Sequence, residues 1–502
     1  MKWMAVAIYS LFILCLSLIT VKKVRTVEDF FLGNRSIGSW ASAFAYGTTY
    51  FSAVVFIGYA GKVGWGFGLS SLWIAAGNAI IGGYLAWRLL ARRTRELTTR
   101  LKALTMPEFL AARYDSPALQ YVAAALIFIF LVPYSASVYM GLSYLIENIF
   151  GVPYLLALIV MALLTAFYLV MGGYFAVALV DLFQGLIMAF GAVLLVVFVT
   201  KSPQVGGLFT GLQRLAEINP GFTKIIGPPG FLPLFALVVL TSFGCWGLPQ
   251  MVQKFYSVKN EDAIRRAQVI TTTFALMIAG AAYYTGAWGR LFFSSLPLSQ
   301  GRPNPDLIVP QMLQMILPEW GAALILLLVL SASMSTLSSL VLVSSSAVVV
   351  DIFKSLFPHW QENCFVGLMR FLCIVFIGLS LYLAVTPTII LVLMALSWGT
   401  LAGAFLGPYL YGLYWRRATR AGAWAGLLTG LAVSLGLAFY FKMDALWIPI
   451  SGSLAMILPL AIVPLVSCLT KAFPESHLEK IFGARDEYRE ERGAEKGLSF
   501  LS

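Results

Sequence analysis

Long apolar runs separated by short polar segments dominate this chain of 502 residues. A helix needs roughly 20 apolar residues to cross the hydrocarbon core of a bilayer. Strands of a membrane β-barrel would instead alternate apolar and polar residues over about ten positions, and no useful length of this chain does so. The pattern predicts an all-α polytopic membrane protein with thirteen transmembrane helices, near residues 3–20, 40–60, 70–90, 120–146, 152–171, 178–199, 230–252, 268–293, 318–349, 363–386, 388–413, 421–441 and 446–470.

The composition agrees with this class, because 60% of the residues are hydrophobic and 11% are charged, against about 25% charged in soluble domains. The net charge of +12 does not indicate a nucleic-acid partner, because it follows the predicted topology. By the positive-inside rule, Lys and Arg mark cytoplasmic loops, and here they concentrate in 21–39, 88–117, 254–267, 350–362, 414–420 and the tail from 471. We expect the N-terminus outside and the C-terminus in the cytoplasm.

Neither end of the sequence predicts a separate domain. The first apolar run has no small-residue cleavage site and is followed by basic residues on the wrong side for a secretory signal, so we expect a retained helix. The charged tail, residues 471–502, is too short for an enzymatic domain. No H-E-x-x-H or G-x-S-x-G motif is present, and the five cysteines and two histidines show no metal-site spacing. We expect neither an enzyme nor an organic cofactor.

Two predicted spans carry unusual Gly and Pro interruptions. The second span contains Gly47, Gly58, Gly61 and Gly64, and the seventh contains Gly244, Gly247 and Pro249. Small residues can simply pack helices together, but an interrupted helix also frees backbone groups that a cavity, ligand or ion must satisfy. The two spans open consecutive groups of five, which is typical of inverted repeats around a transporter's central site. We see no residue-level similarity between the two groups.

A ladder of hydroxyl residues, "SASMSTLSSLVLVSSS", lies within the ninth predicted span at 331–346. Ser335, Thr336, Ser338 and Ser339 fall on neighbouring positions of a helix surface. Hard cations prefer oxygen ligands, and neutral hydroxyls and carbonyls bind sodium reversibly, so this part of the ladder predicts half of a sodium site. For residues 344–346 we expect ordinary hydrogen bonds to carbonyls one turn earlier.

Asp181 is the clearest carboxylate embedded among apolar residues. A buried acid in a membrane helix is expensive and usually functional, although pairing with the backbone or with Gln184 would give it a purely structural role. We interpret its partner as a second cation, shared with Ser335, Ser338 and Ser339.

Several stretches together resemble the sodium/solute symporter family, in particular its proline, pantothenate and monocarboxylate carriers rather than its sugar carriers. They are "FFLGNRSIGSW", "YFSAVVFIGYAGK", "LTMPEFLAARYDSP", "YLVMGGYFAVALVDLFQG", "GLPQMVQKF", "SASMSTLSSLVLVSSSAVVVDIFK" and "WGTLAGAFLGPYLYGLYWRRATRAGAWAGLLTG". The resemblance implies a LeuT-like core of five plus five inverted helices, with one helix before and two after. The corresponding divisions are 1–39 (extra helix and loop), 40–229 (first repeat), 230–420 (second repeat), 421–470 (two C-terminal helices) and 471–502 (cytoplasmic tail).

The resemblance also implies ligands for one or two sodium ions. The main site would use the carbonyls of Thr48, Phe51 and Ala332 with the hydroxyls of Ser335 and Thr336. A second sodium would lie at Asp181, Ser335, Ser338 and Ser339. Two positions depart from the family pattern: Val180 replaces a usual hydroxyl, and Tyr50 stands where proline carriers have an acid.

The substrate pocket implied by the resemblance contains few polar groups and neither acid nor base. A sugar requires several hydrogen-bonding partners, so a small amino acid or monocarboxylate, such as proline or pantothenate, fits better. Lys62 could assist an anion, or could simply be a solvated loop residue. The implied pocket residues are Ser52, Val54, Val55, Tyr134, Thr241, Cys245 and Trp398.

These features favour a sodium-coupled symporter that works by alternating access in a plasma or inner membrane. Its partners would be a small solute, sodium and lipid, and we expect a functional monomer. A proton-coupled carrier of the same fold, with Asp181 as the proton site, is the main alternative, and a transporter-like sensor is another. A channel would need a continuous polar pore, whereas the hydroxyls here cluster in one span.

Overall fold

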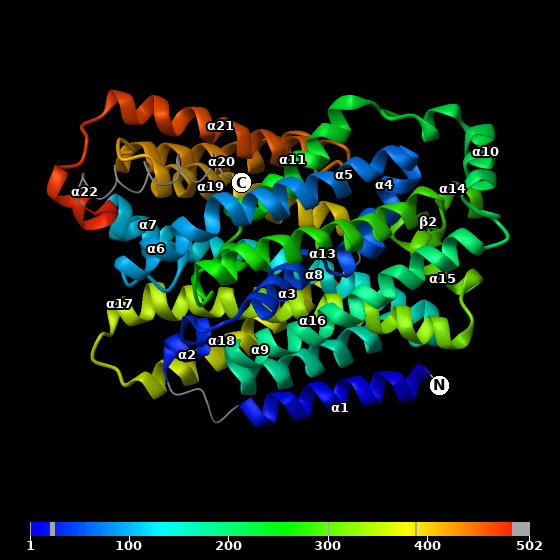
Figure 1. Ribbon diagram of the computed structural model, residues 1–502, viewed down its shortest axis with the longest axis horizontal. Helices are drawn as coiled ribbons and strands as arrows, with labels where there is room; N and C mark the ends of the chain where they lie inside the picture. Colours follow the sequence, from blue (N-terminus) through cyan, green and yellow to red (C-terminus); the bar gives the residue numbers. More distant parts are fainter. Residues whose placement is uncertain (1, 21–25, 300, 387–388, 484–502) are drawn as a thin grey trace.

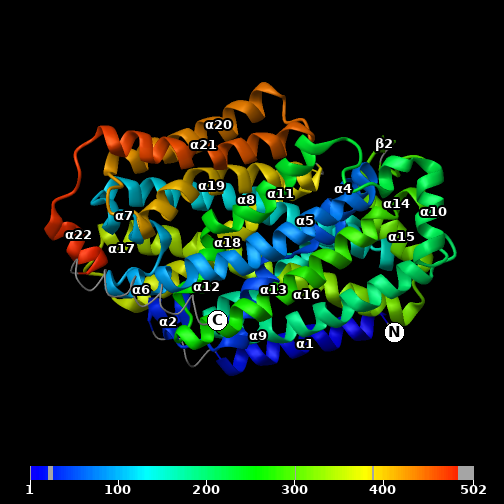
Figure 2. The same cartoon turned by 45° about the horizontal axis from the view of Figure 1, so that its top comes forward.

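The computed structural model describes residues 2–20, 26–299, 301–386 and 389–483. Helices lie side by side along the long axis of the molecule, with loops gathered at its two ends (Figures 1 and 2). The described part contains one sheet, formed by β1 (Leu298–Ser299) and β2 (Arg302–Pro303), which pair antiparallel. The predicted all-α class is confirmed.

Helical segments of the first part of the chain begin with α1 and end with α9; η marks short 3₁₀ or π segments. They are α1 (Lys2–Thr20), α2 (Val27–Leu32), η2 (Gly33–Arg35), α3 (Ser39–Tyr50), η3 (Val54–Tyr59), α4 (Ala60–Phe67), η4 (Gly68–Ser71), α5 (Leu72–Gly77), η5 (Asn78–Leu85), η6 (Trp87–Ala91), α6 (Arg92–Arg100), α7 (Met106–Tyr114), α8 (Pro117–Phe150) and α9 (Tyr154–Lys201).

Helical segments of the second part run from α10 to α22. They are α10 (Leu208–Ile218), η7 (Pro220–Thr223), α11 (Phe231–Gly247), α12 (Pro249–Tyr256), α13 (Glu261–Ala287), α14 (Gly289–Phe292), η8 (Pro305–Leu307), α15 (Ile308–Ile316), α16 (Glu319–Val348), η9 (Val349–Phe353), α17 (Lys354–Leu356), α18 (Glu362–Val385), α19 (Ile390–Tyr414), α20 (Arg420–Tyr440), α21 (Trp447–Leu469) and α22 (Glu475–Phe482).

Within the described residues, nine helices are long and apolar enough to cross a membrane, or ten if the bent pair α11 and α12 forms one span. Two shorter apolar helices, Met4–Ile13 and Tyr154–Phe167, lie in α1 and α9. In α16 and α19, 89% of the apolar window is buried, against 39% in α18, α20 and α21. Because an apolar residue that is exposed in a membrane protein faces lipid, α16 and α19 form the centre of the bundle. The total of thirteen spans stays a prediction.

Helix α9 illustrates why helix count and span count differ. Its 48 residues would extend about 70 Å at 1.5 Å per residue, more than twice the thickness of a bilayer core. Tyr174 bonds Ser257 just before α13 begins, whereas Thr200 bonds Tyr284 near the end of α13. The second half of α9 therefore already spans the bundle, and the first half leaves room for a separate span, as the sequence predicts.

The glycines of the second predicted span do not interrupt it. Gly47, Gly58, Gly61 and Gly64 lie within helical segments, and a Cβ at each would meet a neighbouring segment at 2.5, 2.6, 3.0 and 2.0 Å, respectively. Their role is close packing, the alternative weighed from the sequence. The interpretation that they break the helix is wrong, because the break falls at Phe51 and Ser52.

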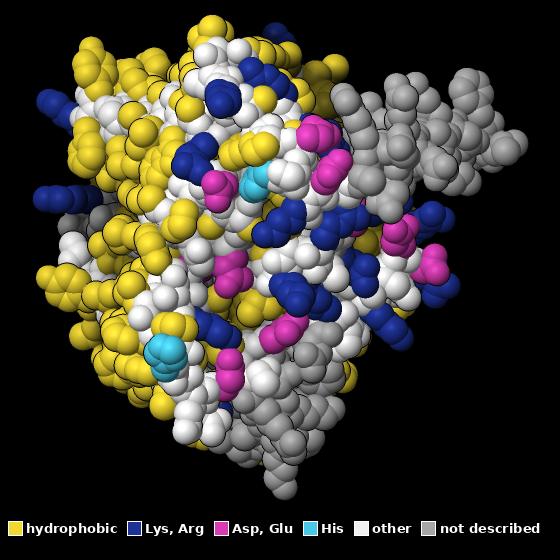
Figure 3. Space-filling model, turned by 90° about the vertical axis from the view of Figure 1, so that its left-hand side faces the viewer, with side chains coloured by type: hydrophobic (Ala, Val, Ile, Leu, Met, Phe, Trp, Pro, Cys, Tyr) yellow, Lys and Arg dark blue, Asp and Glu magenta, His cyan; other side chains and the backbone are white. Residues whose placement is uncertain are grey.

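Charged side chains gather on one end of the molecule, where α6, α7, α17 and α22 lie (Figure 3). These four helices come from the basic segments 88–117, 350–362 and the described part of the tail from 471, so these described parts share one end of the bundle. Lys62 is an exception to the predicted loops: it lies on α4 and is partly buried. The helix extends past the predicted end of the span because its apolar residues continue to Phe67.

The closest helix approach supplies a test of this packing. A Cβ at Gly64 would lie 2.0 Å from the carbonyl carbon of Gly286, whereas one at Gly66 on the same helix meets nothing within 4 Å. We expect Gly64→Ala to destabilise the protein by about 1–3 kcal/mol, as overpacking does, and Gly66→Ala to be neutral or slightly stabilising. Melting temperatures of the purified variants measure this, and equal values for the two would contradict the packing described.

Candidate functional site

The first helix break lies at the end of α3, deep in the bundle. Phe51 has an extended backbone (φ −115°, ψ 111°), and its N–H still bonds the carbonyl of Gly47 at 3.2 Å. Ser52 then starts the next segment, since its hydroxyl accepts from the N–H of Val54 at 3.2 Å. Thr48 and Thr49 lie in the last turn of α3. Because the helix stops there, their carbonyls lack the backbone N–H donors that a following helical turn would supply.

Two hydroxyls of α16 lie where these missing donors would be. The Ser335 hydroxyl contacts the carbonyl of Thr48 at 3.1 Å, and the Thr336 hydroxyl contacts the carbonyls of Thr48 and Thr49 at 3.2 Å each. Both hydroxyls also lie 3.0–3.1 Å from the carbonyl of Ala332. All of these residues are buried, so the oxygens form a compact group within the bundle.

This group contains four of the five ligands predicted for the main sodium site. A hard cation such as calcium lies about 2.3–2.6 Å from its oxygens, which places neighbouring ligands a little over 3 Å apart. The present separations fit that spacing, provided the two hydroxyls turn their lone pairs toward the ion. Phe51, the fifth predicted ligand, begins the break, and its ring stacks on Tyr50 with centroids 4.4 Å apart.

Several other hydroxyls between residues 331 and 346 bond carbonyls of their own helix. Ser333, Ser345 and Ser346 bond carbonyls one turn earlier at 2.7, 2.7 and 2.8 Å. Ser338 likewise bonds the carbonyl of Ser335 at 2.8 Å. The hydroxyl of Ser344 has no hydrogen-bond partner within the described part of the chain. The expected back-bonding is therefore found at two of the three positions 344–346.

The predicted second ion site contains a residue that the sequence analysis assigned to a loop. Lys254 is fully buried on α12, and its ammonium donates to the Ser339 hydroxyl at 2.9 Å. Ser339 also lies 2.9 Å from the Thr49 hydroxyl. The second helix break, at Leu248, bends α11 and α12 by 46° and directs Lys254 inward. The sequence contains one indication that Lys254 is buried: it lies only five residues after Pro249, on the same broken span.

Asp181, predicted for the same ion site, has no hydrogen-bond partner among the described residues. Both carboxylate oxygens are buried and lack a hydrogen bond to any described residue. Gln184, the partner considered from the sequence, instead donates to the Tyr9 hydroxyl at 2.8 Å. The charged group that acts on Asp181 is Lys254.

All seven predicted pocket residues are buried, at the first break and on α8, α11 and α19. The Trp398 ring meets Tyr134 edge-on, with centroids 5.8 Å apart, and lies parallel to Tyr50 at 6.1 Å. Thr241 and Cys245 use their side chains locally, bonding the carbonyls of Leu237 and Ser242 at 2.8 and 3.1 Å. The residues predicted for the pocket thus include two buried aromatic rings, and the polar side chains of Thr241 and Cys245 are used in local hydrogen bonds.

Two further residues are hydrogen-bonded beside the predicted pocket residues. The Tyr50 hydroxyl donates to the carbonyl of Thr241 at 2.7 Å and lies 3.2 Å from Asn78 Oδ1. Ser242 also donates to Asn78 Oδ1, at 3.1 Å. Asn78 was missed because a single amide in an apolar run carries no periodic signal. Tyr50, noted in the sequence as a departure, joins α3 to α11.

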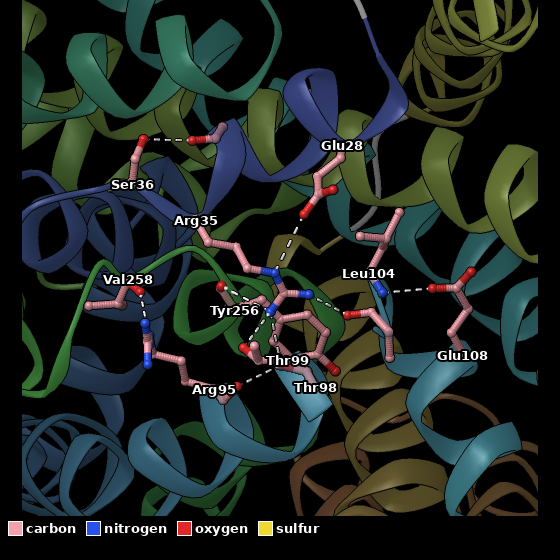
Figure 4. A network of polar contacts seen from close by, with 12 residues as sticks. Glu28, Arg35, Ser36, Arg95, Thr98, Thr99, Leu104, Glu108, Tyr256 and Val258 are labelled. Carbon is pink, nitrogen blue, oxygen red and sulfur yellow. Dashed lines mark hydrogen bonds and ion pairs between the residues drawn. The ribbon is translucent and has the colours of Figure 1, made fainter. Parts of the chain in front are cut away.

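Backbone contacts join the segments next to the two broken helices at one end of the bundle. Ile37, before α3, forms a parallel bridge with Val258, after α12: the Ile37 N–H donates to the carbonyl of Ser257 at 3.1 Å, and the Ile37 carbonyl accepts from the N–H of Lys259 at 3.0 Å. Arg35 donates to the carbonyl of Ala103 at 2.7 Å and pairs with Glu28 at 3.6 Å, and Arg95 donates to the carbonyl of Val258 at 2.8 Å (Figure 4). These contacts lie at the end of the bundle where α2 and α6 are placed (Figures 1 and 2).

At the other end, the loop before α15 reaches the first broken span. Asp306 is buried, and its Oδ2 accepts from the N–H of Ile390 at the start of α19, at 3.0 Å. Desolvation raises the pKa of Asp306 to about 6, although the Ile390 bond and the charge of Lys62 oppose this shift. The carboxyl therefore links α19 to the loop that covers this end.

The structure defines a class of helical membrane protein in which two interrupted spans surround a buried oxygen cluster. The family model described as "Sodium:solute symporter family" matches residues 30–430, and the chain belongs to that family. It is thus a sodium-coupled solute symporter, and the family inferred from its motifs is confirmed.

Curated relatives are similar over most of their length. A sodium/proline symporter of Haemophilus influenzae is 31% identical over 84% of this chain and 85% of its own. The Escherichia coli sodium/proline symporter is 29% identical with the same coverage. One from Staphylococcus aureus is 27% identical over 97% of this chain and 96% of its own.

Solved structures share the fold. A Na⁺-coupled sialic acid symporter in a substrate-bound, outward-open state has a TM-score of 0.78 at 18% identity, covering 94% of this chain and 98% of its own. Mhp1, a nucleobase-cation-symport-1 family transporter in a closed conformation, has a TM-score of 0.52 at 16% identity, covering 91% and 98%, respectively.

The position of Asp306 predicts a pH-dependent stability. Its pKa of about 6 in the folded protein exceeds the unfolded value of about 3.9, so the folded state binds more protons between these values and loses stability as the pH rises through them. The loss amounts to about 3 kcal/mol at pH 7. Asp306→Asn keeps an acceptor for Ile390 but cannot ionise. We expect the variant to melt higher than wild type at pH 7.5, with the difference disappearing toward pH 4. A difference that does not change with pH would contradict this account.

Proposed function

We propose that the protein imports a small amino acid or monocarboxylate together with sodium, by alternating access. The observation that carries this proposal is the group formed by the carbonyls of Thr48 and Ala332 and the hydroxyls of Ser335 and Thr336. These neutral oxygens join the interrupted α3 to the central α16. A sodium ion among them would stabilise the conformation in which the two helices are in contact.

The pocket chemistry supports a small substrate with an apolar body. Tyr50, Tyr134 and Trp398 supply aromatic surface, and the pocket residues predicted from the sequence include no charged group. The carboxylate of such a substrate would be held near the start of α12, where a helix N-terminus carries partial positive charge. The sodium/proline symporters among the relatives support proline as the first compound to test.

The proposed arrangement in the membrane follows the charge distribution. The basic end seen in Figure 3 would face the cytoplasm, with the N-terminus outside and the C-terminal tail inside, in the inner membrane of a bacterial cell. Residues 40–229 and 230–420 would form the two inverted repeats, each opened by a broken helix. Closure at Ile37 and Val258 would keep the cytoplasmic path shut while the ion binds.

Binding of sodium itself is the most direct test. A ligand at 100 times its Kd stabilises the folded state by about 2.7 kcal/mol, so sodium chloride should raise the melting temperature above the values in potassium and choline chloride. Ser335→Ala should abolish the sodium shift. Ser333→Ala is the matched control, since that equally buried hydroxyl bonds only the carbonyl of Val329. Sodium-driven uptake of proline into proteoliposomes should follow the same order.

The same measurements can contradict the proposed function. Equal melting temperatures in all three salts, together with uptake driven by a proton gradient and lost in Asp181→Asn, would replace sodium coupling with proton coupling. Sodium shifts that persist in Ser335→Ala would place the ion elsewhere.

A further inference from the structure

Lys254 is a buried cation within reach of the second predicted sodium site. Its side chain is 0% exposed, and its ammonium lies 2.9 Å from the Ser339 hydroxyl and 4.9 Å from the centre of the Tyr174 ring. A hydroxyl and an aromatic face both stabilise a cation, but neither neutralises its charge. A buried ammonium requires a negative partner.

Asp181 is the negative charge available to it. The carboxylate is buried and accepts no hydrogen bond from any residue that the structure describes. Lys254 and Asp181 are not in direct contact, but each is the charged side chain that acts on the other. One ammonium and one carboxylate therefore offset each other's charge inside the bundle without forming a hydrogen-bonded pair.

One hydroxyl predicted for a second sodium already contacts a cation. Ser339 contacts both the Lys254 ammonium and the Thr49 hydroxyl, at 2.9 Å each. A sodium ion here would lose Ser339 as a free ligand, and it would add a second positive charge where one carboxylate balances one cation. The residues present do not fit a second sodium.

We propose that the Lys254 ammonium takes the place of the second cation, so that the protein binds a single sodium ion, at the main site. This inference rests on the proposed sodium coupling. The lysine is carried on α12, directly after the second helix break, and reaches α16 through Ser339. It therefore links the second broken helix to the central helix permanently, as an ion would do reversibly.

The experiment counts bound sodium on the purified full-length protein, by equilibrium dialysis with radiolabelled sodium in detergent. Wild type should bind one ion per chain, with a Hill coefficient of one in the melting-temperature titration. Lys254→Gln leaves the Asp181 charge unbalanced and should bind two. Lys254→Arg keeps the positive charge and should bind one. The double variant Lys254→Gln with Asp181→Asn removes both charges and should return to one.

The outcomes separate this inference from the proposed function. Two ions on the wild type would overturn the inference and leave sodium coupling intact, and this result needs no variant. No sodium on the wild type would overturn the proposed function. One ion on both wild type and a correctly folded Lys254→Gln variant would show that the lysine does not exclude a second ion, which also overturns the inference. Elution of each variant as a single symmetric peak is the folding control.

Discussion

The carbonyl of Thr48, at the end of a helix that stops inside the bundle, is the group on which the arrangement of the central helices depends. Thr48 is buried, and leaving a buried backbone carbonyl unpaired at membrane depth costs several kcal/mol. The hydroxyls of Ser335 and Thr336 supply the missing donors. Helix α16 must therefore lie directly against the end of α3, which accounts for its nearly complete burial.

The two helix breaks have different physical origins. Between α11 and α12, Pro249 has no N–H to donate, so the interruption is fixed by covalent structure. Between α3 and η3 there is neither Gly nor Pro, and the break persists because side chains replace the lost backbone bonds: Ser52 from one side and the α16 hydroxyls from the other. Only the first break is held by groups that a cation could engage instead. An ion at the proposed site would therefore act on the geometry of the first broken helix.

The sequence predicts the features that depend on local properties. Apolar length identifies the membrane helices, and Pro249 locates the second break, because both act through the residues themselves. The site of the first break is not a local property, since the hydroxyls that permit it lie 287 residues further along the chain. The nearby glycines lie on the helix that is interrupted, but they pack against neighbouring segments and do not cause the interruption.

Lys254 shows the same limit for charge. In the sequence, Lys254 stands next to the polar segment that follows α12. The positive-inside rule therefore assigns it to a cytoplasmic loop. Its burial results from a bend that aims α12 into the bundle and from an acid supplied by another helix. The sequence singles out Asp181 as a buried carboxylate and predicts a cation as its partner. That a lysine is also buried in this region depends on how the broken helix is directed in three dimensions.

The proposed ion site and the proposed substrate pocket share consecutive residues of one chain segment. Thr48 and Thr49 contact the α16 hydroxyls, while the next residue, Tyr50, bonds α11 and lies parallel to Trp398. Because α3 ends at Tyr50, a shift of the Thr48 carbonyl would displace the Tyr50 ring, which lies beside Trp398 of the proposed pocket. A cation that favours one position of this carbonyl therefore favours one shape of the pocket, and a substrate that favours that shape strengthens ion binding by the same factor. Coupling between the two ligands requires no relay through distant helices, since a single peptide segment contributes to both.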